Sequence, residues 1–264
     1  MAVVVPENRQ ALDQGRVCRG DQLANQAQSA QADTVTLIAP GGIRAPIERM
    51  IPDVERKTGH TVVATFGSGG GTKMRIMSGE VFDVPIVQPP LSEVLATGHV
   101  VASTETPLAV APVAVAVRKG VAMPDIATPD AVKKMLRAAK SVAYPDPARG
   151  AAAGASFDAT LERLGIVEQM QPKIVRAQGG AGAMALLAKG EVDIGVTFLS
   201  EIHDPGVAVV GLLPSEISKP TALVGYVSTH ARSPAAARAL LMYLSSPEAA
   251  DVYKALGMVP GRYY

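Results

Sequence analysis

The segment Thr65-Phe66-Gly67-Ser68-Gly69-Gly70-Gly71-Thr72-Lys73 joins a strand-like stretch, residues 61–64, to a helix-like stretch, residues 73–78. Glycines at such a junction let backbone N–H groups approach a ligand, and the dipole of the following helix favours negative charge. Ser68 and Thr72 add hydroxyl groups. The loop is not a P-loop, because no Gly-Lys-Ser/Thr sequence closes it. The segment predicts an anion-binding loop, although a flexible glycine-rich turn would have the same composition.

A second unit of the same kind precedes this one. Residues 34–39 are typical of a buried strand, residues 40–42 of a turn, and residues 43–57 of a helix with apolar residues at helical spacing. Consecutive strand–loop–helix units build a parallel sheet, and ligands bind beyond the carboxyl ends of its strands. The two glycine loops are therefore expected at one edge of a sheet.

Composition narrows the class of protein. The chain has 264 residues, of which 48% are hydrophobic and 19% charged, so a globular protein with one large or two small domains is expected. A net charge of +1 without a basic run argues against nucleic acid as a partner. Because Cys18 is the only cysteine, an internal disulfide and a cysteine-based metal site are excluded.

The first 32 residues differ from the rest, because charged and amide side chains interrupt every apolar run. Ala30-Gln31-Ala32 has the small-x-small form of a signal-peptidase site, but the apolar segment expected upstream is missing. Residues 1–32 are interpreted either as the remnant of a signal peptide or as a disordered leader of a cytoplasmic protein. We favour export to the periplasm, since the first strand follows directly.

The middle of the chain predicts a second lobe. The apolar run 108–117 contains Pro112, which a continuous strand does not tolerate, and it is interpreted as a crossover between lobes. Strands are expected at 81–87, 140–144, 174–177 and 192–196, and a second crossover at 221–228. Helices are expected at 128–139 with Thr128 as N-cap, at 157–164 and 184–189 after small-residue loops, and at 234–244 and 247–256 at the end of the chain.

The expected fold is therefore α/β, with two Rossmann-like lobes joined by a two-strand hinge. Lobe I would comprise residues 33–112 and 226–264, and lobe II residues 113–225. Four small-residue loops would meet in the cleft between the lobes, where a ligand is held by closure of the lobes.

Three segments resemble the type 2 periplasmic solute-binding proteins, in the branch that contains the molybdate-binding proteins: Leu37-Ile38-Ala39, residues 55–62 leading to Phe66-Gly67-Ser68-Gly69, and residues 79–84. The order of motifs matches from Asp33 to Gly261. Residues 116–120, 124–126, 138–144 and 161–166 are similar to a sub-branch related to a bacterial aconitate isomerase. The resemblance implies a two-lobed receptor for a small anion and an ABC-transporter permease as partner.

The chain departs from this family where a ligand would bind. Its first loop, Pro40-Gly41-Gly42-Ile43-Arg44, has no hydroxyl group, whereas molybdate binders of the family have Ala/Ser-rich hydroxyl loops there. Thr197 and Phe198 stand where the family often has a tyrosine, and the glutamine typical of the isomerase sub-branch is absent. A small organic di- or tricarboxylate is therefore at least as good a candidate as molybdate, tungstate or another oxyanion.

Candidate ligand-binding residues come from the expected loops and their neighbours. Arg149 is placed to grip a carboxylate, whereas Arg44 could meet an anion or pair with Glu48. The full set is Gly41, Gly42, Ile43, Arg44, Ser68, Gly69, Gly70, Thr72, Pro90, Arg149, Gly150, Ala151, Gln178 and Thr197.

Two function classes remain open from the sequence. A solute receptor would need no catalytic residue, whereas an isomerase acting on a tricarboxylic acid by allylic proton transfer would need a base, for which Glu201 is the candidate. The histidines have no metal-ligand spacing, so neither a metal nor a cofactor is expected. A monomer that binds no nucleic acid is expected.

Overall fold

The computed structural model describes residues 32–261, so the expected leader lies almost entirely outside the described residues. The first of two sheets has six strands in the order β11-β4-β10-β3-β1-β2. They are β1 (Thr34–Pro40), β2 (Thr61–Gly67), β3 (Val84–Val87), β4 (Thr106–Ala111), β10 (Thr221–Gly225) and β11 (Val259–Pro260). Strand β1 is parallel to β2 and β3, whereas β10 runs antiparallel to β3 and β4.

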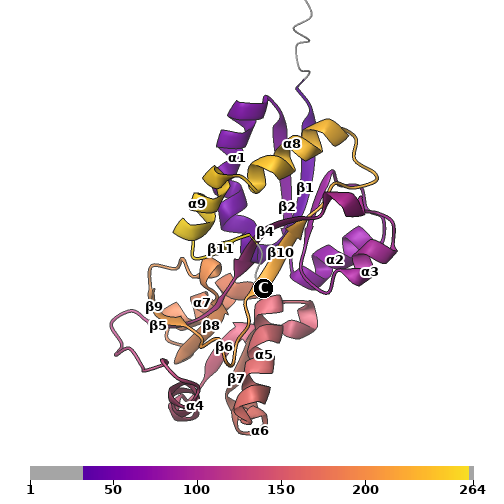
Figure 1. Ribbon diagram of the computed structural model, residues 1–264. Coiled ribbons are helices and arrows are strands. Elements are labelled where there is room, and N and C mark those ends of the chain that lie inside the picture. Colours follow the sequence, from indigo (N-terminus) through magenta and orange to yellow (C-terminus); the bar gives the residue numbers. More distant parts are fainter. Residues whose placement is uncertain (1–31, 262–264) are drawn as a thin grey trace, which may run out of the picture. The chain divides into compact units, whose positions relative to one another are not determined.

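Helices cover both faces of this first sheet. They are α1 (Arg44–Thr58), α2 (Gly69–Met77), α3 (Ser92–Ala96), α8 (Pro234–Leu244) and α9 (Pro247–Ala255), with the 3-10 turns η1 (Gly41–Ile43) and η2 (Ala102–Thr104). Figure 1 shows α1, α8 and α9 on one side and α2 and α3 on the other. Alternation along β1 explains this arrangement, since Leu37 packs in the cluster that includes Ile47 of α1, and Ile38 in the cluster that includes Ile76 of α2.

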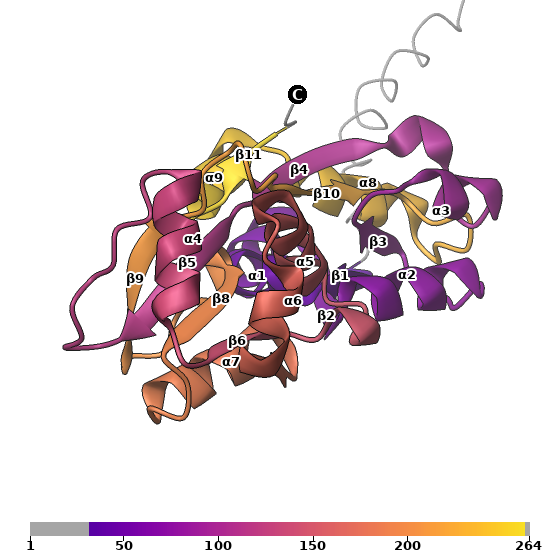
Figure 2. The same ribbon diagram turned by 90° about the horizontal axis from the view of Figure 1, so that it is seen from below.

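The second sheet has five strands in the order β7-β6-β8-β5-β9. These are β5 (Val113–Arg118), β6 (Val142–Pro145), β7 (Ile174–Ala177), β8 (Ile194–Phe198) and β9 (Val207–Leu212). Its helices are α4 (Pro129–Ala138), α5 (Ala152–Leu164), α6 (Val167–Met170) and α7 (Gly179–Ala188), with the 3-10 turns η3 (Pro147–Arg149), η4 (Gln171–Lys173) and η5 (Leu199–Glu201). Val115 shares a core cluster with Phe157 of α5, and Ala116 shares another with Met184 of α7, so α5 and α7 lie on opposite faces of this sheet (Figure 2).

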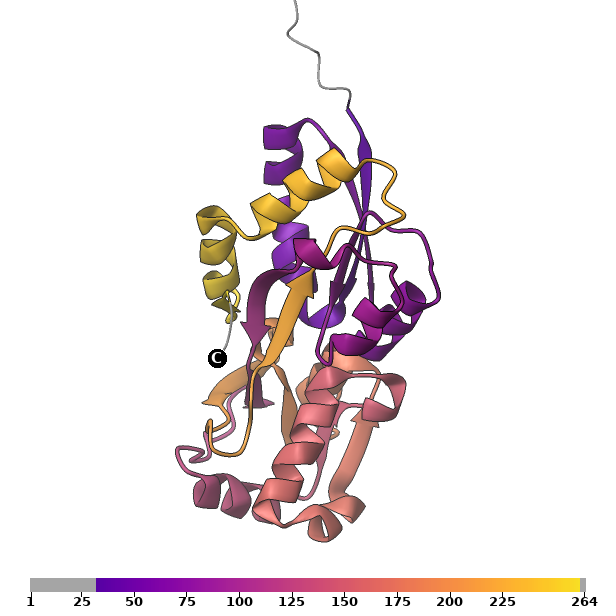
Figure 3. The same ribbon diagram turned by 45° about the vertical axis from the view of Figure 1, so that its right-hand side comes forward.

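Two chain segments connect the sheets. Strand β4 ends at Ala111 and β5 begins at Val113, so the break predicted at Pro112 is confirmed and separates a strand of one sheet from a strand of the other. Within residues 32–261, strand β10 pairs with β3 and β4 of the first sheet, and it runs beside β4 (Figure 3). The return to the first sheet therefore comes before Thr221, earlier than the predicted boundary between residues 225 and 226. The rest of the division into lobes stays a prediction.

Several helices begin earlier than the sequence predicts. Helix α2 starts at Gly69 rather than residue 73, α5 at Ala152 rather than 157, and α7 at Gly179 rather than 184. Glycine is a poor helix former, which is why the first residues of α2 and α7 were expected to be loop. In each case the small residues form the first helical turn itself. By contrast, α4 begins as predicted, because the Thr128 hydroxyl accepts a hydrogen bond from the Ala131 N–H.

Among the described residues, no helix has the length and apolarity needed to cross a lipid bilayer.

Candidate functional site

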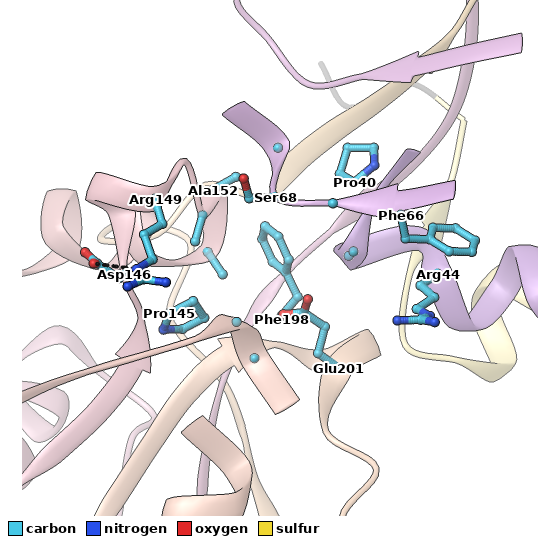
Figure 4. A pocket seen from close by; sticks show the side chains of 18 of the residues that line it. Pro40, Arg44, Phe66, Ser68, Pro145, Asp146, Arg149, Ala152, Phe198 and Glu201 are labelled. Carbon is cyan, nitrogen blue, oxygen red and sulfur yellow. Dashed lines mark ion pairs between the residues drawn. The ribbon is translucent and has the colours of Figure 1, made fainter. Parts of the chain in front are cut away.

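A cavity of about 510 Å³ lies where strand ends of the two sheets meet. The segments after β1, β2 and β3 line it from the first sheet, and those after β6, β7 and β8 from the second. This is the place predicted from parallel strand order, at the carboxyl ends of the strands. Figure 4 shows Asp146 and Arg149 on one side of the cavity, Arg44 and Phe66 on the other, and Phe198 and Glu201 between them.

Besides α1, which begins at Arg44, three helices begin in the loops that line the cavity. The first residue of α2, Gly69, follows the N-cap Ser68, whose hydroxyl accepts a hydrogen bond from the Gly71 N–H at 3.1 Å. The N-caps of α5 and α7, Ala151 and Gln178, provide no such side-chain bond. The first-turn N–H groups of these two helices therefore remain available to an anion.

The two arginines at the cavity differ in what they contact. Arg149 in η3 has a side chain that is 69% exposed, and its Nε lies 3.8 Å from the Asp146 carboxylate. Arg44 donates from Nε to Glu48 at 2.8 Å and lies over the ring of Phe66. Of the two roles considered for Arg44, an ion pair with Glu48 or a contact with an anion, the structure shows the ion pair. Arg149 lies near the Asp146 carboxylate but makes no close ion pair with it.

Gln88 is a cavity residue that the sequence analysis did not select. It follows β3 directly and is 5% exposed. The residue lines the cavity, and its side-chain amide has no hydrogen bond to any of residues 32–261. A Cβ atom on Gly69 would lie 1.9 Å from its Oε1, so Gly69 is needed to make room for this amide. An amide that opens on a cavity and has no protein partner can form hydrogen bonds to a ligand.

Glu201 in η5 faces the cavity between two glycines. A Cβ atom on Gly41 would lie 3.5 Å from its Oε1, and one on Gly180, in the first turn of α7, would collide with its Oε2. The Thr197 hydroxyl donates a hydrogen bond to Oε2. Burial raises the pKa of Glu201, although the bonds from Thr197 and the Phe198 backbone and the nearby His203 act in the opposite direction. The carboxyl group therefore holds a proton more readily than an exposed glutamate.

The two lobes touch directly at one edge of the cavity. The Gly70 N–H donates to the Gly150 carbonyl at 2.9 Å, and a Cβ atom on Gly70 would lie 2.9 Å from the Gly150 Cα. Neither Gly69 nor Gly70 has a positive φ, and a Cβ atom on either would meet neighbouring protein atoms, so these two glycines allow close packing beside the cavity. Gly150 does have a φ of 77°.

The structure brings nine of the expected residues to the cavity: Gly41, Gly42, Arg44, Ser68, Gly69, Arg149, Ala151, Gln178 and Glu201. The other six do not line it: Ile43, Gly70, Thr72, Pro90, Gly150 and Thr197.

Each residue that does not line the cavity has another place in the fold. Ile43 and Thr72 are buried, and Thr197 supports Glu201 from beneath. The Pro90 carbonyl accepts a hydrogen bond from the Lys73 ammonium group at 2.8 Å.

The cavity is also lined by residues that were not among the candidate binding residues, although they lie in loops expected at the ligand: Phe66, Gln88, Asp146, Gly179 and Gly180. A usable signal was their position, since each lies at or directly after the end of an expected strand. In the described part of the chain, no three His, Cys, Asp or Glu side chains gather where they could hold a metal ion.

Residues 35–259 match the family described as bacterial extracellular solute-binding protein, and the chain belongs to that family. The fold and the cavity between its two sheets are those of a type 2 periplasmic solute-binding protein.

Among its relatives is an aconitate isomerase from a Pseudomonas species, 33% identical over 86% of this chain and 88% of the relative. The molybdate-binding protein ModA of Azotobacter vinelandii is 28% identical over 88% of this chain and 92% of its own length. The solved structure of the Azotobacter vinelandii periplasmic molybdate-binding protein superposes with a TM-score of 0.74 at 21% identity, covering 86% of this chain and 100% of that chain. Likeness at that identity shows the shared fold.

Proposed function

We propose that this solute-binding protein takes up a small organic anion with two or three carboxylate groups and presents it to an ABC-transporter permease. The observation that carries the proposal is the cavity of about 510 Å³ with helix N-termini on its wall. That volume is typical of sites for small organic molecules, roughly 300–1,000 Å³. A tetrahedral oxyanion has only five heavy atoms and would fill a small part of it.

The chemistry of the wall supports the same ligand class. Ser68 has the only side-chain hydroxyl among the lining residues, so the ring of hydroxyl donors that would enclose a compact oxyanion is missing. The available donors are spread across the cavity instead: Arg149 and the start of α5 in lobe II, Gln88 and Ser68 in lobe I. Donors this dispersed suit a ligand whose anionic groups are themselves several bonds apart.

The related proteins are named either for a compact oxyanion or for an organic acid with several carboxyl groups. ModA proteins are named for molybdate, and the Pseudomonas relative is named for aconitate, a tricarboxylic acid. The higher identity is to the latter. The proposal extends to a monomeric protein of the periplasm, exported through a signal peptide that ends near residue 32, with no nucleic acid partner.

A ligand screen by thermal unfolding tests the proposal, because a ligand that binds only the folded state raises the melting temperature. The panel comprises trans-aconitate, citrate, succinate, molybdate, tungstate and sulfate. We expect a rise with the carboxylates, confirmed by calorimetry, and loss of that rise in Arg149→Gln. The matched control is Arg163→Gln, because Arg163 lies on α5 and contacts the Ile217 carbonyl rather than the cavity. A rise with molybdate or tungstate alone would contradict the proposal.

A second candidate function is isomerisation of a tricarboxylic acid, and the position of Glu201 favours it. Its carboxyl group lines the cavity and its pKa is raised by burial, as a general base working near neutrality requires. In that reaction Glu201 would remove an allylic proton from one carbon and return it to another. Proton NMR of trans-aconitate in deuterated water separates the two functions. We expect binding without exchange; deuterium incorporation or conversion to the cis isomer, abolished by Glu201→Gln, would establish the enzyme.

A further inference from the structure

Glu201 places a carboxyl group on the wall of the cavity that is proposed to bind an anion. Glu201 belongs to the cavity wall, and its two oxygens have different surroundings. Oε2 accepts the Thr197 hydroxyl and lies against Gly180, whereas Oε1 is directed toward Gly41 of the other lobe. Oε1 is therefore the oxygen that a ligand between the lobes would meet.

We propose that Glu201 shares a proton with a carboxylate of the bound ligand, so that the ligand enters the cavity together with a proton taken from solution. This inference rests on the proposed function, because it requires a ligand with a carboxylate group. Two ionised carboxylates at hydrogen-bond distance repel each other, and a single shared proton converts the repulsion into a hydrogen bond.

The groups around Glu201 offset this repulsion only in part. Arg149 is positive but is 69% exposed beside Asp146, and the first turn of α7 contributes only the partial positive charge of a helix N-terminus. Helix α7 and strand β8 contain no charged residue, and among the elements near Glu201 the titratable groups are His203 after η5, Arg44 at the start of α1, and Asp146 and Arg149 at η3. Arg44 is paired with Glu48, and Asp146 adds a second negative charge to the wall.

Thr197 also favours a shared proton between Glu201 and a ligand carboxylate. Its hydroxyl holds Oε2 in place, so the carboxyl group cannot turn both oxygens away from the cavity without losing that bond. The raised pKa of Glu201 has the direction that a shared proton requires.

A shared proton would make the site select among anions by the strength of their conjugate acids. A carboxylate is the base of a weak acid and can hold half of a shared proton, whereas sulfate is the base of a strong acid and cannot at neutral pH. The site should therefore take carboxylates and reject sulfate, even where their charges are equal.

Calorimetry with trans-aconitate in two buffers of different ionisation enthalpy measures the protons taken up. For the wild type we expect uptake of about one proton per ligand and an affinity that falls about tenfold per pH unit between about pH 6 and about pH 8. Glu201→Gln keeps the size and can donate a hydrogen bond permanently, so it should bind with no proton uptake and a flat pH profile. At the upper pH it should bind more tightly than the wild type.

Two control variants separate the origins of the pH dependence. Glu162→Gln, an exposed change on α5, should retain the wild-type slope, and His203→Asn should retain it also. A slope that survives Glu201→Gln, or that disappears in His203→Asn, overturns the inference while the proposed function stands. Absence of binding by trans-aconitate, citrate and succinate at every pH overturns the proposed function and this inference together. Sulfate that binds as tightly as trans-aconitate overturns the selectivity.

Discussion

Gln88 illustrates how a residue at a cavity wall can serve binding without serving the fold. Its amide makes no hydrogen bond to any of residues 32–261, and it is not among the fully buried polar atoms of that range that lack a partner, so it opens on the cavity. A ligand in the cavity can therefore bond to this amide in place of water. Binding and stability should accordingly respond differently to a change at this residue.

Replacing Gln88 by methionine tests this separation. Methionine has nearly the same length and flexibility but no polar hydrogen, so the volume beside Gly69 is kept. We expect an unchanged or higher melting temperature without ligand, and an affinity for trans-aconitate that is reduced about tenfold, equivalent to ~1.4 kcal/mol. Differential scanning fluorimetry and calorimetry measure the two effects. A melting temperature that falls while affinity is retained would show that Gln88 is a structural residue.

Glu201 should make stability depend on pH in a predictable direction. Because burial raises its pKa above the ordinary 4.5, the folded state binds the proton more tightly than the unfolded state does. This contribution to stability is complete below the ordinary pKa and is lost as the pH rises through the raised value. Glu201→Gln should therefore melt higher than the wild type at about pH 8, by ~2–4 °C, and the difference should shrink toward about pH 5. An equal difference at both pH values would contradict this.

For helices and loops, the sequence predicted where the glycine-rich segments lie but not the backbone conformation that they adopt. Position alone predicted that the segments after β1, β2, β6 and β7 meet at a cavity, and they do. The same composition hid the fact that glycines form the first turns of α2 and α7, because helix propensity argues against glycine there. Helix α5 begins with Ala152 and Ala153, which are good helix formers, so propensity does not explain why its start was predicted too late. Propensity is a local property, whereas these turns pack against residues more distant in the chain: Gly70 of α2 against Gly150, and Gly180 of α7 against Glu201.

Gly70 and Gly150 form a contact that only two glycines allow. We expect Gly70→Ala to hold the lobes apart, because its Cβ atom would lie 2.9 Å from the Gly150 Cα, and to lower the affinity for trans-aconitate about tenfold or more. Stability without ligand should be unchanged or higher, since alanine is the better helix former by ~1 kcal/mol. Calorimetry and thermal unfolding measure these two quantities.

Gly182→Ala is the matched control for that variant. Gly182 lies in α7 beside the cavity, and its Cβ atom would meet Ala177 at an ordinary 3.8 Å. We expect a stabilised protein with wild-type affinity. If Gly70→Ala also binds as the wild type does, the contact between Gly70 and Gly150 plays no part in ligand capture.

At the scale of the whole described chain, the two-sheet α/β architecture followed from the sequence, because its determinants are local. Strand–loop–helix repeats predicted the parallel strands, and Pro112 alone predicted where the chain leaves one sheet for the other. Contacts between the lobes have no such local signal. The packing of Phe198 against Gly42 and the bond from Gly70 to Gly150 join residues far apart in sequence, so no periodicity records them.

The contacts between lobes also indicate how the cavity opens. Near the crossover, the Leu199 N–H donates to the Pro112 carbonyl and the Ser200 hydroxyl to the Gly42 carbonyl, the latter at 2.7 Å in a buried position. At another edge of the cavity, the lobes meet through Gly70 and Gly150, a single backbone bond beside the exposed Arg149. The second contact is the weaker of the two, so rotation about the crossover strands should break it first.

Small-angle X-ray scattering tests this closure. We expect saturating trans-aconitate to reduce the radius of gyration of the wild-type protein, because ligand bound between the lobes favours the state in which Gly70 meets Gly150. Gly70→Ala, at a ligand concentration high enough to saturate it, should show a smaller reduction, since its methyl group prevents full approach. Gly182→Ala should behave as the wild type does. Scattering curves that coincide with and without ligand in the wild type would mean that binding does not change the population of the closed state, and the hinge would then have no role in capture.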